Sequence, residues 1–437
     1  GGGNPNFSYC GLDISGQNPG TIVVSTMNRW ATHDDIYLSR DGGKHWKSLG
    51  PQARHNPAGY PWLVDYLKGE DWMGHWIADV KIDPFNPASL VYGTGYGLWM
   101  TWNLDQIDGS GDLHFEFIQK GFEETAVLDL ASPPAGATVY AAMGDVAGAG
   151  WDDAAQPPKV GLFRPNSESN LSVDFAALAP EYVVRTSDSA ATNGYFSSDG
   201  GLSWRPFPTT PHKRQNAKGE WQNAGRICIS AKGTSLLWLP DKEGAFFSRD
   251  MGKTWSASKG VAASDRSLSG TSDRAVDGVF YIHDRLNNAV LISVDAGASF
   301  QPVIKGLPKI EGWQGSQLVA TPGRMRDIWL ALPQGLFHSA DEKTALANVK
   351  GVDAAWLVAL GAAPIGQTYP TVFVYGKVKG KAGIWRSDDV GQTWIRINDD
   401  FHQFGALRAM AADPLEFGTV YIGPHGRGVM VGRPAGA

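Results

Sequence analysis

Asp145 is the acidic residue whose setting best suits chemistry on a large substrate. It lies in the segment AAMGDVAGAGWDD, after the β-rich run YAAM and among glycines that would let a bulky substrate approach the backbone. A carboxyl group in such a place can serve as the general acid in cleavage of a glycosidic bond. Asp152 and Asp153 follow closely, but their pairing is typical of a solvated turn. Because glycosidic cleavage uses two carboxyl groups, Asp145 is a candidate for one half of such a site.

The region between residues 50 and 195 is rich in aromatic residues, in a chain with 17 tryptophans. Flat aromatic rings stack on the apolar faces of sugars, so the loop-like stretch HNPAGYPWLVDYLKGEDWMGHW predicts a glycan-binding cleft. Some of these rings must instead belong to the core, and Trp99 and Trp102, in the run GLWMTW, should alternate across a sheet. The candidates for substrate contacts are Trp30, Tyr60, Trp62, Trp72, Trp76, Tyr96, Trp102 and Trp151, of which Trp30, Trp62 and Trp72 are the most strongly expected to be exposed.

Other polar clusters give weaker indications of chemistry. The run His33-Asp34-Asp35 could bind a metal, but three adjacent polar residues at a turn are usually solvated. His75 and Asp79 could form an acid–base pair. No zinc-type spacing, Gly-rich phosphate loop or Ser-His-Asp order stands out. The sequence therefore predicts no metal and no cofactor. Its scattered arginines do not exclude a sialidase, in which arginines bind the carboxylate of sialic acid.

Composition excludes several classes of protein. There are 38 basic and 44 acidic residues, a net charge of −6, which argues against a nucleic-acid or anionic-membrane partner. No apolar run approaches the roughly 18 residues that a membrane helix needs. With 54 glycines, 26 prolines and only 19% charged residues, the chain suits short strands and many turns. Its two cysteines are expected to be unpaired, and a start at Gly-Gly-Gly is expected of a processed protein or of part of a longer one.

The elements that must position these residues are revealed by an internal repeat. The pattern Ser-x-Asp-x-Gly-x-x-aromatic, an Asp box, recurs at Ser39–Trp46, Ser197–Trp204, Ser248–Trp255, Ser293–Phe300 and Ser387–Trp394, with a decayed copy near Ser339–Asp341. From Asp199 onward the copies are 45 to 51 residues apart, and the first gap is about three such periods. In each box Asp and Gly favour a tight hairpin, and the aromatic residue should anchor it in the core. The box aspartates are therefore expected to be structural.

β-Rich runs precede and follow each box, so each period should hold about four short strands, the content of one propeller blade. The sequence predicts an all-β chain that forms one β-propeller over residues 1–437, with seven blades or alternatively eight. The ends, about 1–50 and 405–437, could close the ring or pack on a second propeller. One way to close it would pair the strands of 419–432 with the blade that contains Asp41.

In combination, several segments resemble the carboxy-terminal half of glycoside hydrolase family 74, over essentially the whole chain. They are STMNRW with IYLSRDGGKHW, IDPFNPASLVYGTGYGLW, EETAVLDLASPP, MGDVAGAGWDD, RINDDFHQFG and VYIGPHGRGVMVG. The resemblance implies secreted enzymes, extracellular or periplasmic, with two tandem seven-bladed propellers that cleave the β-1,4-glucan backbone of xyloglucan with inversion. It matches Asp145 to the family's general acid, which lies in a Gly-Asp-Val-Gly-Gly segment. Here Ala147 replaces one of these glycines.

The family's general base lies in an amino-terminal propeller, in a similar Asp-Val-Gly-Gly turn, and no second such motif is found here. The nearest match, Asp389-Val390-Gly391, lies within an Asp box. Two interpretations remain open. The chain could be the acid-bearing part of a xyloglucan hydrolase, whose partners would be xyloglucan or a related β-glucan and the amino-terminal propeller of the same enzyme. Alternatively, it could be a non-catalytic propeller that binds a glycan or a protein.

Overall fold

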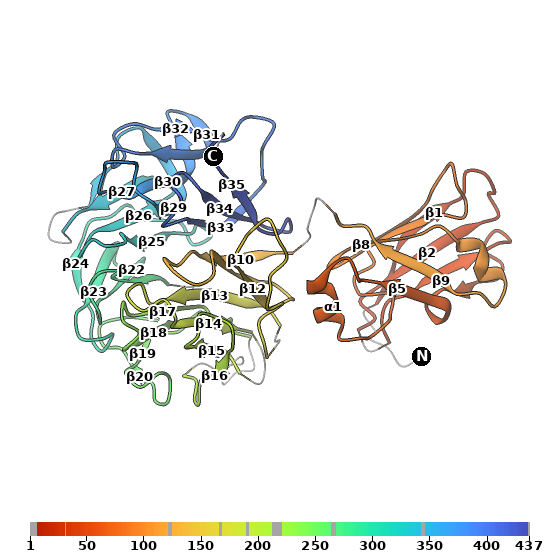
Figure 1. The fold of residues 1–437 in the computed structure, drawn as a ribbon, viewed down its shortest axis with the longest axis horizontal. Helices are drawn as coiled ribbons and strands as arrows, with labels where there is room; N and C mark the ends of the chain where they lie inside the picture. The colour runs from red at the N-terminus through yellow and green to blue at the C-terminus, as the bar shows by residue number, and fades with distance from the viewer. Residues whose placement is uncertain are drawn as a thin grey trace. The chain divides into compact units, whose positions relative to one another are not determined.

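The chain divides into two compact units, residues 1–124 (unit 1) and 125–437 (unit 2), both built almost entirely from β-strands (Figure 1). The computed structural model describes residues 7–30, 32–120, 125–165, 168–188, 192–211, 221–263, 268–341 and 346–435. This division differs from the single propeller over residues 1–437 that the sequence predicts. Unit 1 contains only one of the Asp boxes, so the repeat alone does not reveal where one unit ends and the other begins.

Unit 1 consists of two sheets that pack together through β1 and β6. The first, in the order β1-β2-β3-β4, contains β1 (Ser8–Ile14), β2 (Ile22–Met27), β3 (Ile36–Ser39) and β4 (Lys47–Ser48). The second, in the order β5-β9-β8-β7-β6, contains β5 (Ala53–Asn56), β6 (Asp79–Ile82), β7 (Leu90–Thr94), β8 (Gly97–Thr101) and β9 (Leu113–Phe117). The short helix α1 (Pro61–Leu67) and the 3₁₀ turns η1 (Gly50–Gln52) and η2 (Leu104–Asp108) join these strands. Apolar residues of both sheets, of α1 and of η2 form one core.

Unit 2 contains seven antiparallel sheets in its described residues, each made of consecutive strands. The first three sheets are β10 (Val127–Ala131), β11 (Val139–Met143) and β12 (Gly148–Trp151); β13 (Asn170–Phe175), β14 (Val183–Ser187), β15 (Gly194–Ser197) and β16 (Arg205–Pro206); and β17 (Arg226–Ile229), β18 (Leu236–Leu239), β19 (Phe246–Ser248) and β20 (Ser256–Ala257). The fourth and fifth are β21 (Ser269–Ser272), β22 (Phe280–Asp284), β23 (Ala289–Ser293) and β24 (Gln301–Ile304); and β25 (Gln317–Ala320), β26 (Ile328–Leu332), β27 (Gly335–Ser339) and β28 (Ala347–Asn348). The last two are β29 (Val352–Gly361), β30 (Thr371–Val378), β31 (Lys381–Ser387) and β32 (Ile395–Arg396); and β33 (Leu407–Ala412), β34 (Val420–Pro424) and β35 (Met430–Gly432).

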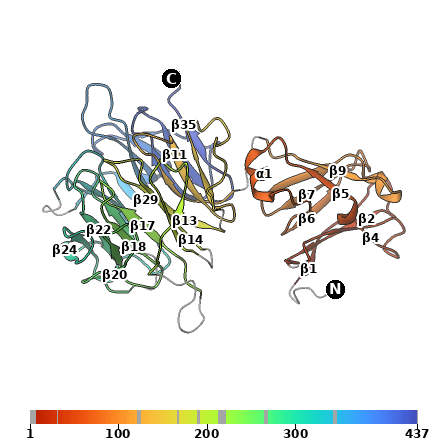
Figure 2. The same ribbon diagram turned by 60° about the horizontal axis from the view of Figure 1, so that its bottom comes forward.

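These sheets form a closed propeller ring. The first strand of each sheet contacts the first strand of the next, and β33 of the last sheet contacts β10 of the first. Figures 1 and 2 show the chain running around the ring from β10 until β33–β35 return beside it. Residues 405–435 thus close the ring on β10, and not on the sheet that contains Asp41, which belongs to unit 1. No helix in the described ranges combines the length and apolar character that crossing a membrane requires.

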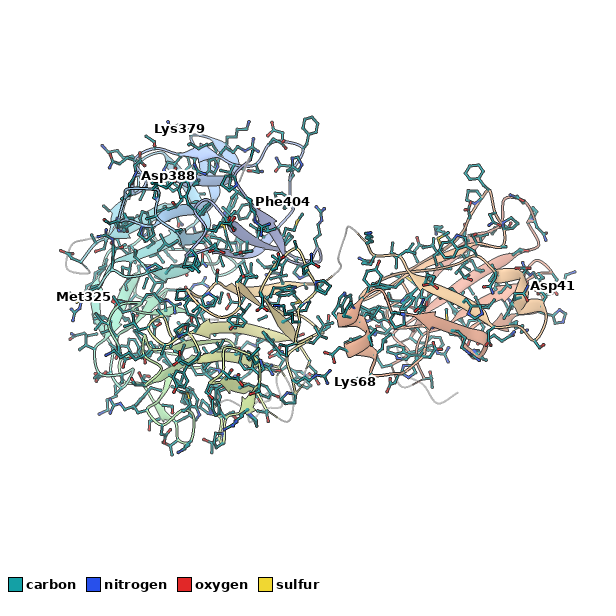
Figure 3. All side chains as sticks on the ribbon, in the orientation of Figure 1. Asp41, Lys68, Met325, Lys379, Asp388 and Phe404 are labelled. Atoms are coloured by element: carbon teal, nitrogen blue, oxygen red, sulfur yellow. The ribbon has the colours of Figure 1, made fainter. Side chains whose placement is uncertain are left out.

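The five Ser-x-Asp-x-Gly turns share one hydrogen-bond pattern. In each, the serine Oγ donates to the aspartate at 2.7–2.9 Å and accepts from the glycine N–H at 2.8–2.9 Å. The aspartates accept further bonds from the residues that follow; those from Thr254 help to hold the pKa of Asp250 at about 2. Figure 3 labels Asp41 on such a turn of unit 1. Each of these carboxylates is therefore hydrogen-bonded within its own hairpin. The aromatic residue at the end of the box is buried at Trp204 but exposed at Trp46.

A buried histidine in unit 2 makes its stability depend on pH. His283 on β22 is almost fully buried, with Nδ1 2.8 Å from the Ser316 hydroxyl, and burial lowers its pKa to about 4. In the unfolded chain His283 binds a proton below about pH 6.5, whereas in the folded chain it stays neutral until about pH 4. The free energy of unfolding therefore decreases as the pH falls from 6.5 toward 4. We expect this residue to cost about 2 kcal/mol of unfolding free energy at pH 5 relative to pH 7.

Urea unfolding of the chain and of a His283→Gln variant at both pH values tests this expectation. The variant should lose about 2 kcal/mol less than the parent between pH 7 and pH 5. The buried His55 of unit 1, whose pKa is also lowered by burial, is present in both proteins and cancels in the comparison. Equal pH-dependent losses would contradict the assignment.

Candidate functional site

Asp145 lies on a strained turn between β11 and β12. Its φ angle is 63°, and that of Ala147 is also 63°, so two residues with side chains adopt the left-handed region. The N–H of Val146 donates to the Gly144 carbonyl oxygen at 2.7 Å, and the N–H of Gly148 donates to the Val146 carbonyl oxygen at 2.7 Å. These are two successive three-residue turns, of the strained kind with positive φ at the centre. Such backbone strain persists only where the surroundings enforce it, and it concentrates at functional sites.

The turn is anchored by a backbone carbonyl on one side and by a serine hydroxyl on the other. Gly144 N–H donates to the carbonyl oxygen of Ala126 at 2.8 Å, and Asp145 N–H donates to the Ser169 hydroxyl at 3.0 Å. Val146 and Ala147 are buried beneath the turn, whereas the Asp145 side chain is exposed. Its carboxylate has no hydrogen-bond or ion-pair partner in the part of the chain that the structure describes. The turn thus presents a carboxylate that the fold itself does not use.

Sheet geometry separates this turn from the Asp boxes. Strands within each sheet are antiparallel, so the connection between the second and third strands lies at the opposite end from that between the third and fourth. The Asp145 turn is a connection of the first kind, and the boxes of unit 2 are of the second kind. Asp145 therefore lies at the end of the ring where the box aspartates are absent.

Two residues near Asp145 carry no sequence signal that would have placed them there. Ser169 accepts the Asp145 N–H through its hydroxyl, and its carbonyl oxygen accepts the N–H of Asp188 at 2.8 Å. The Asp188 carboxylate in turn accepts the Ala224 N–H at 3.1 Å. Ser169 thus joins the Asp145 turn to the next sheet. The contact depends on the long connection between β12 and β13, which contains no recognisable motif.

Other buried carboxylates of unit 2 are already paired. In the central channel, Asp129 lies 3.4 Å from Arg226, and Asp174 lies 2.8 Å from Arg274. Burial raises the pKa of Asp129, and Arg226 opposes this rise. These residues line a cavity of about 130 Å³ between the inner strands. Their charges are neutralised within the channel. Across the described residues, no cluster of three or more His, Cys, Asp or Glu side chains could hold a metal ion.

Trp151, one of the predicted substrate contacts, lies away from the Asp145 turn. It is the last residue of β12, where its carbonyl oxygen accepts the Thr138 N–H at 2.7 Å. It is three positions after Gly148 in the strand, which places it about 10 Å further along the sheet, toward the opposite end. Trp151 is half-buried there, so we remove it from the contacts expected beside the acid.

Two of the tryptophans proposed for substrate contacts form an exposed pair in unit 1. Trp30 is 51% exposed and Trp76 47%, with ring centroids 5.8 Å apart. The Trp76 indole donates to the Asn28 side-chain oxygen at 2.8 Å, and its backbone N–H donates to the Asp34 carboxylate at 2.7 Å. Trp76 also has a φ of 56°. The ring is thus fixed in place while its surface stays open, as a stacking platform requires.

The remaining aromatic candidates of unit 1 differ in exposure. Trp102 is 50% exposed while Trp99 is fully buried, which confirms the predicted alternation. Trp72, Tyr60 and Trp62 are half-buried and pack on the core of unit 1, and the indole N–H groups of Trp62 and Trp72 are covered. Tyr96 is only 3% exposed and lies within that core. Its prediction as a substrate contact is therefore wrong, because the residues around it leave no ring face for a sugar.

Asp34 is buried, although the sequence suggested that the run His33-Asp34-Asp35 is a solvated turn. It accepts bonds from Thr26 at 3.2 Å, from the Arg29 N–H at 3.0 Å and from the Trp76 N–H. Asp34 therefore fixes the backbone beneath the exposed tryptophan pair. His33 packs against Trp72 with its ring tilted by 33° and the ring centroids 4.4 Å apart.

Comparisons with known proteins agree with this architecture. No protein-family model matches the chain. It is 34% identical to a xyloglucanase of Paenibacillus sp, covering 98% of this chain and 43% of that protein. It is 32% identical to a xyloglucanase of Acetivibrio thermocellus, covering 98% and 51%. A solved glycoside hydrolase family 74 xyloglucanase from Xanthomonas campestris superposes with a TM-score of 0.85 at 30% identity, covering 99% of this chain and 60% of that one.

The chain thus spans about half the length of the curated relatives that it matches. A second solved structure, a family 74 enzyme from Niastella koreensis, superposes with a TM-score of 0.79 at 29% identity and covers 98% of this chain. The likeness extends through both units, since each of these comparisons covers at least 98% of this chain. This chain belongs to glycoside hydrolase family 74.

Proposed function

We propose that the chain supplies the general acid of a glycosidase that cleaves the β-1,4-glucan backbone of xyloglucan with inversion. The observation that carries the proposal is the Asp145 carboxylate, exposed and unpaired among the described residues, on a turn anchored by Ala126 and Ser169. The relatives named as xyloglucanases support the substrate class. Asp145, when protonated, donates its proton to the glycosidic oxygen as the bond to the sugar breaks.

The second carboxylate acts on the opposite face of the sugar. In an inverting enzyme it activates a water molecule, and the two carboxyl groups stand roughly 6.5–9.5 Å apart. We place this general base on an amino-terminal propeller of the same enzyme, as the family pattern implies. The other acids of unit 2 considered above are bonded to arginines or to backbone N–H groups.

We propose separately that the exposed aromatic residues of unit 1 bind glucan chains. Trp30, Trp76 and Trp102 present ring faces on which glucosyl units can stack. Trp76 is the best fixed of the three, because both its backbone and its indole are hydrogen-bonded. Xyloglucan is a polymer that cannot enter cells, so we also propose that the protein acts outside the cytoplasm, in the extracellular space or the periplasm.

The experiment that tests this proposal is release of reducing ends from xyloglucan, with NMR of the first products. The chain is assayed alone and together with the amino-terminal half of the Paenibacillus relative. We expect hydrolysis with the added half, and the α-anomer as the first product of a β-linked substrate. The β-anomer as first product would overturn inversion.

A second candidate function is a non-catalytic propeller that binds a glycan or a protein. It is favoured by Asp145, the one acid discussed above that has no partner among the described residues, and by the exposed tryptophan pair of unit 1, since each suits binding without turnover. Binding of xyloglucan with no hydrolysis under either condition would support this function and reject the first. Hydrolysis by the chain alone would mean that the second carboxylate lies within these 437 residues.

A further inference from the structure

A basic hollow lies on unit 2 beside the end of the ring that carries Asp145. Its volume is about 670 Å³, and it is lined by the loop that leads into β33 and by the turn between β34 and β35. The chemistry of its wall comes from Gln403, Phe404, Arg408, His425 and Arg427. Figure 3 labels Phe404 on the loop before β33. We call this feature the basic hollow below.

The charge of the basic hollow is unbalanced. Three of its lining residues are basic and none is acidic. Arg408, His425 and Arg427 are exposed and have no ion-pair partner among the residues that the structure describes. Other arginines of the same two sheets are paired, namely Arg386 with Asp388, Arg396 with Asp400 and Arg433 with Glu416. Because the chain as a whole carries a net charge of −6, this local excess of positive charge is not a general property of its surface.

One short backbone segment connects the basic hollow with the Asp145 turn. Gly428 N–H, one residue after Arg427, donates to the carbonyl oxygen of Thr125 at 2.9 Å. The next carbonyl oxygen along the chain, that of Ala126, accepts the Gly144 N–H from the Asp145 turn. Both turns connect the second and third strands of their sheets, so they lie at the same end of the ring. A substrate held at Asp145 therefore has the basic hollow one sheet away.

We propose that the basic hollow binds a carboxylate-bearing sugar on a side branch of the glucan substrate. The guanidinium groups of Arg408 and Arg427 each offer paired N–H donors whose spacing matches a carboxylate. Phe404 offers an apolar ring surface, and the Gln403 amide offers further hydrogen bonds for sugar hydroxyls. A neutral branch would leave the two guanidinium cations without a counter-charge. The substrate class is thus an acidic, uronic-acid-branched xyloglucan, an inference that rests on the proposed function.

Binding of a matched pair of oligosaccharides tests the inference directly. One is a galactosylated xyloglucan oligosaccharide, and the other is the same molecule with the galactose C6 oxidised to a carboxylate. By calorimetry at low salt, we expect the chain to bind the acidic form about tenfold more tightly, since charge-assisted hydrogen bonds are about twice as strong as neutral ones. Salt at about 0.5 M should remove most of this preference by screening the exposed charges.

Single variants and a matched control assign the preference to the basic hollow. Arg427→Gln and Arg408→Gln should each reduce the ratio of acidic to neutral affinity several-fold. Lys253→Gln removes an equally exposed cation from a box turn at the opposite end of the ring and should leave the ratio as in the parent. A parent that binds both forms equally, or arginine variants that keep the full ratio, would overturn the proposal.

Hydrolysis of the same two oligosaccharides separates this inference from the proposed function. If neither is hydrolysed under any condition while the acidic form still binds more tightly through Arg427, the hydrolase assignment fails and the basic hollow stands. If both are hydrolysed with equal kcat/KM and equal affinity, the basic hollow fails and the hydrolase assignment stands.

Discussion

An Asp145→Asn variant should lose roughly 10²- to 10⁴-fold in kcat/KM on xyloglucan, the usual contribution of a general acid. The asparagine has nearly the same shape and leaves the hydrogen bonds of the turn in place, because those bonds come from the backbone of residues 144–148 and from Ser169. It cannot donate a proton to the leaving oxygen. Binding of xyloglucan should therefore change little, and the loss should appear in kcat.

Substrates with different leaving groups distinguish a general acid at position 145 from a residue with only a structural role. A dinitrophenyl glycoside of a xyloglucan oligosaccharide has a leaving group that needs no proton, so the Asp145→Asn variant should hydrolyse it within about tenfold of the parent rate. Asp199→Asn is the matched control, because that carboxylate is bonded within its own hairpin by Ser197 and Ser203. The Asp199→Asn variant should be less stable than the parent but should hydrolyse both substrates at the parent rates. An equal loss on both substrates in the Asp145 variant would reject the role as acid.

Gly148→Ala should be the most disruptive single change at the turn. The φ angle of Gly148 is 133°, and a Cβ there would lie 2.1 Å from the carbonyl oxygen of Ala141 and 3.0 Å from the Phe163 ring. The clash is with backbone of the paired strand, so it cannot be relieved by a side-chain rotation. The substitution costs free energy both through backbone strain at this φ and through overpacking. Together we expect these two effects to lower the unfolding free energy of unit 2 by roughly 3–5 kcal/mol. The Asp145 turn would move with it, and hydrolysis would fall.

Gly144→Ala in the same turn provides the comparison. Its Cβ would meet Ala126 at 3.5 Å, an ordinary contact, and its φ lies outside the left-handed region. Its cost should stay below about 1 kcal/mol. Denaturant unfolding followed by tryptophan fluorescence gives both values. A Gly148→Ala protein as stable as Gly144→Ala would show that the turn is not as tightly enforced as its geometry indicates.

Features that are local in sequence could be predicted from it. Each Asp-box turn is closed by bonds within eight residues, so residue types and spacing suffice to identify it. The opposite exposures of Trp99 and Trp102 follow from strand alternation alone. The strained turn at Asp145 could be located by its glycines. The sequence did not show that Ala147 forms the centre of a second strained turn directly after the first.

Features that depend on distant segments could not be predicted. Tyr96 is an aromatic residue at a turn, and only the packing of the unit 1 core shows that it is buried. Ser169 reaches Asp145 across a long connection, and Arg408 and Arg427 line the same hollow only because β33 and β34 pair. The boundary after residue 124 is equally hidden, because the sheets on either side of it are built from strands of similar length and spacing.

The ring of unit 2 closes where β33 meets β10, and each of these strands belongs to a sheet made only of its own consecutive strands. This seam is held by side-chain packing, such as Gly423 against Val127, and by the bond from Gly428 to Thr125, with no ladder of strand hydrogen bonds across it. Local opening of the native state costs least where fewest cooperative bonds must break, so amide hydrogens along residues 125–126 and 425–428 should exchange faster than those of the ladders around them. A glycan that spans the Asp145 turn and the basic hollow would bridge this seam, and its binding energy would then also hold the ring shut.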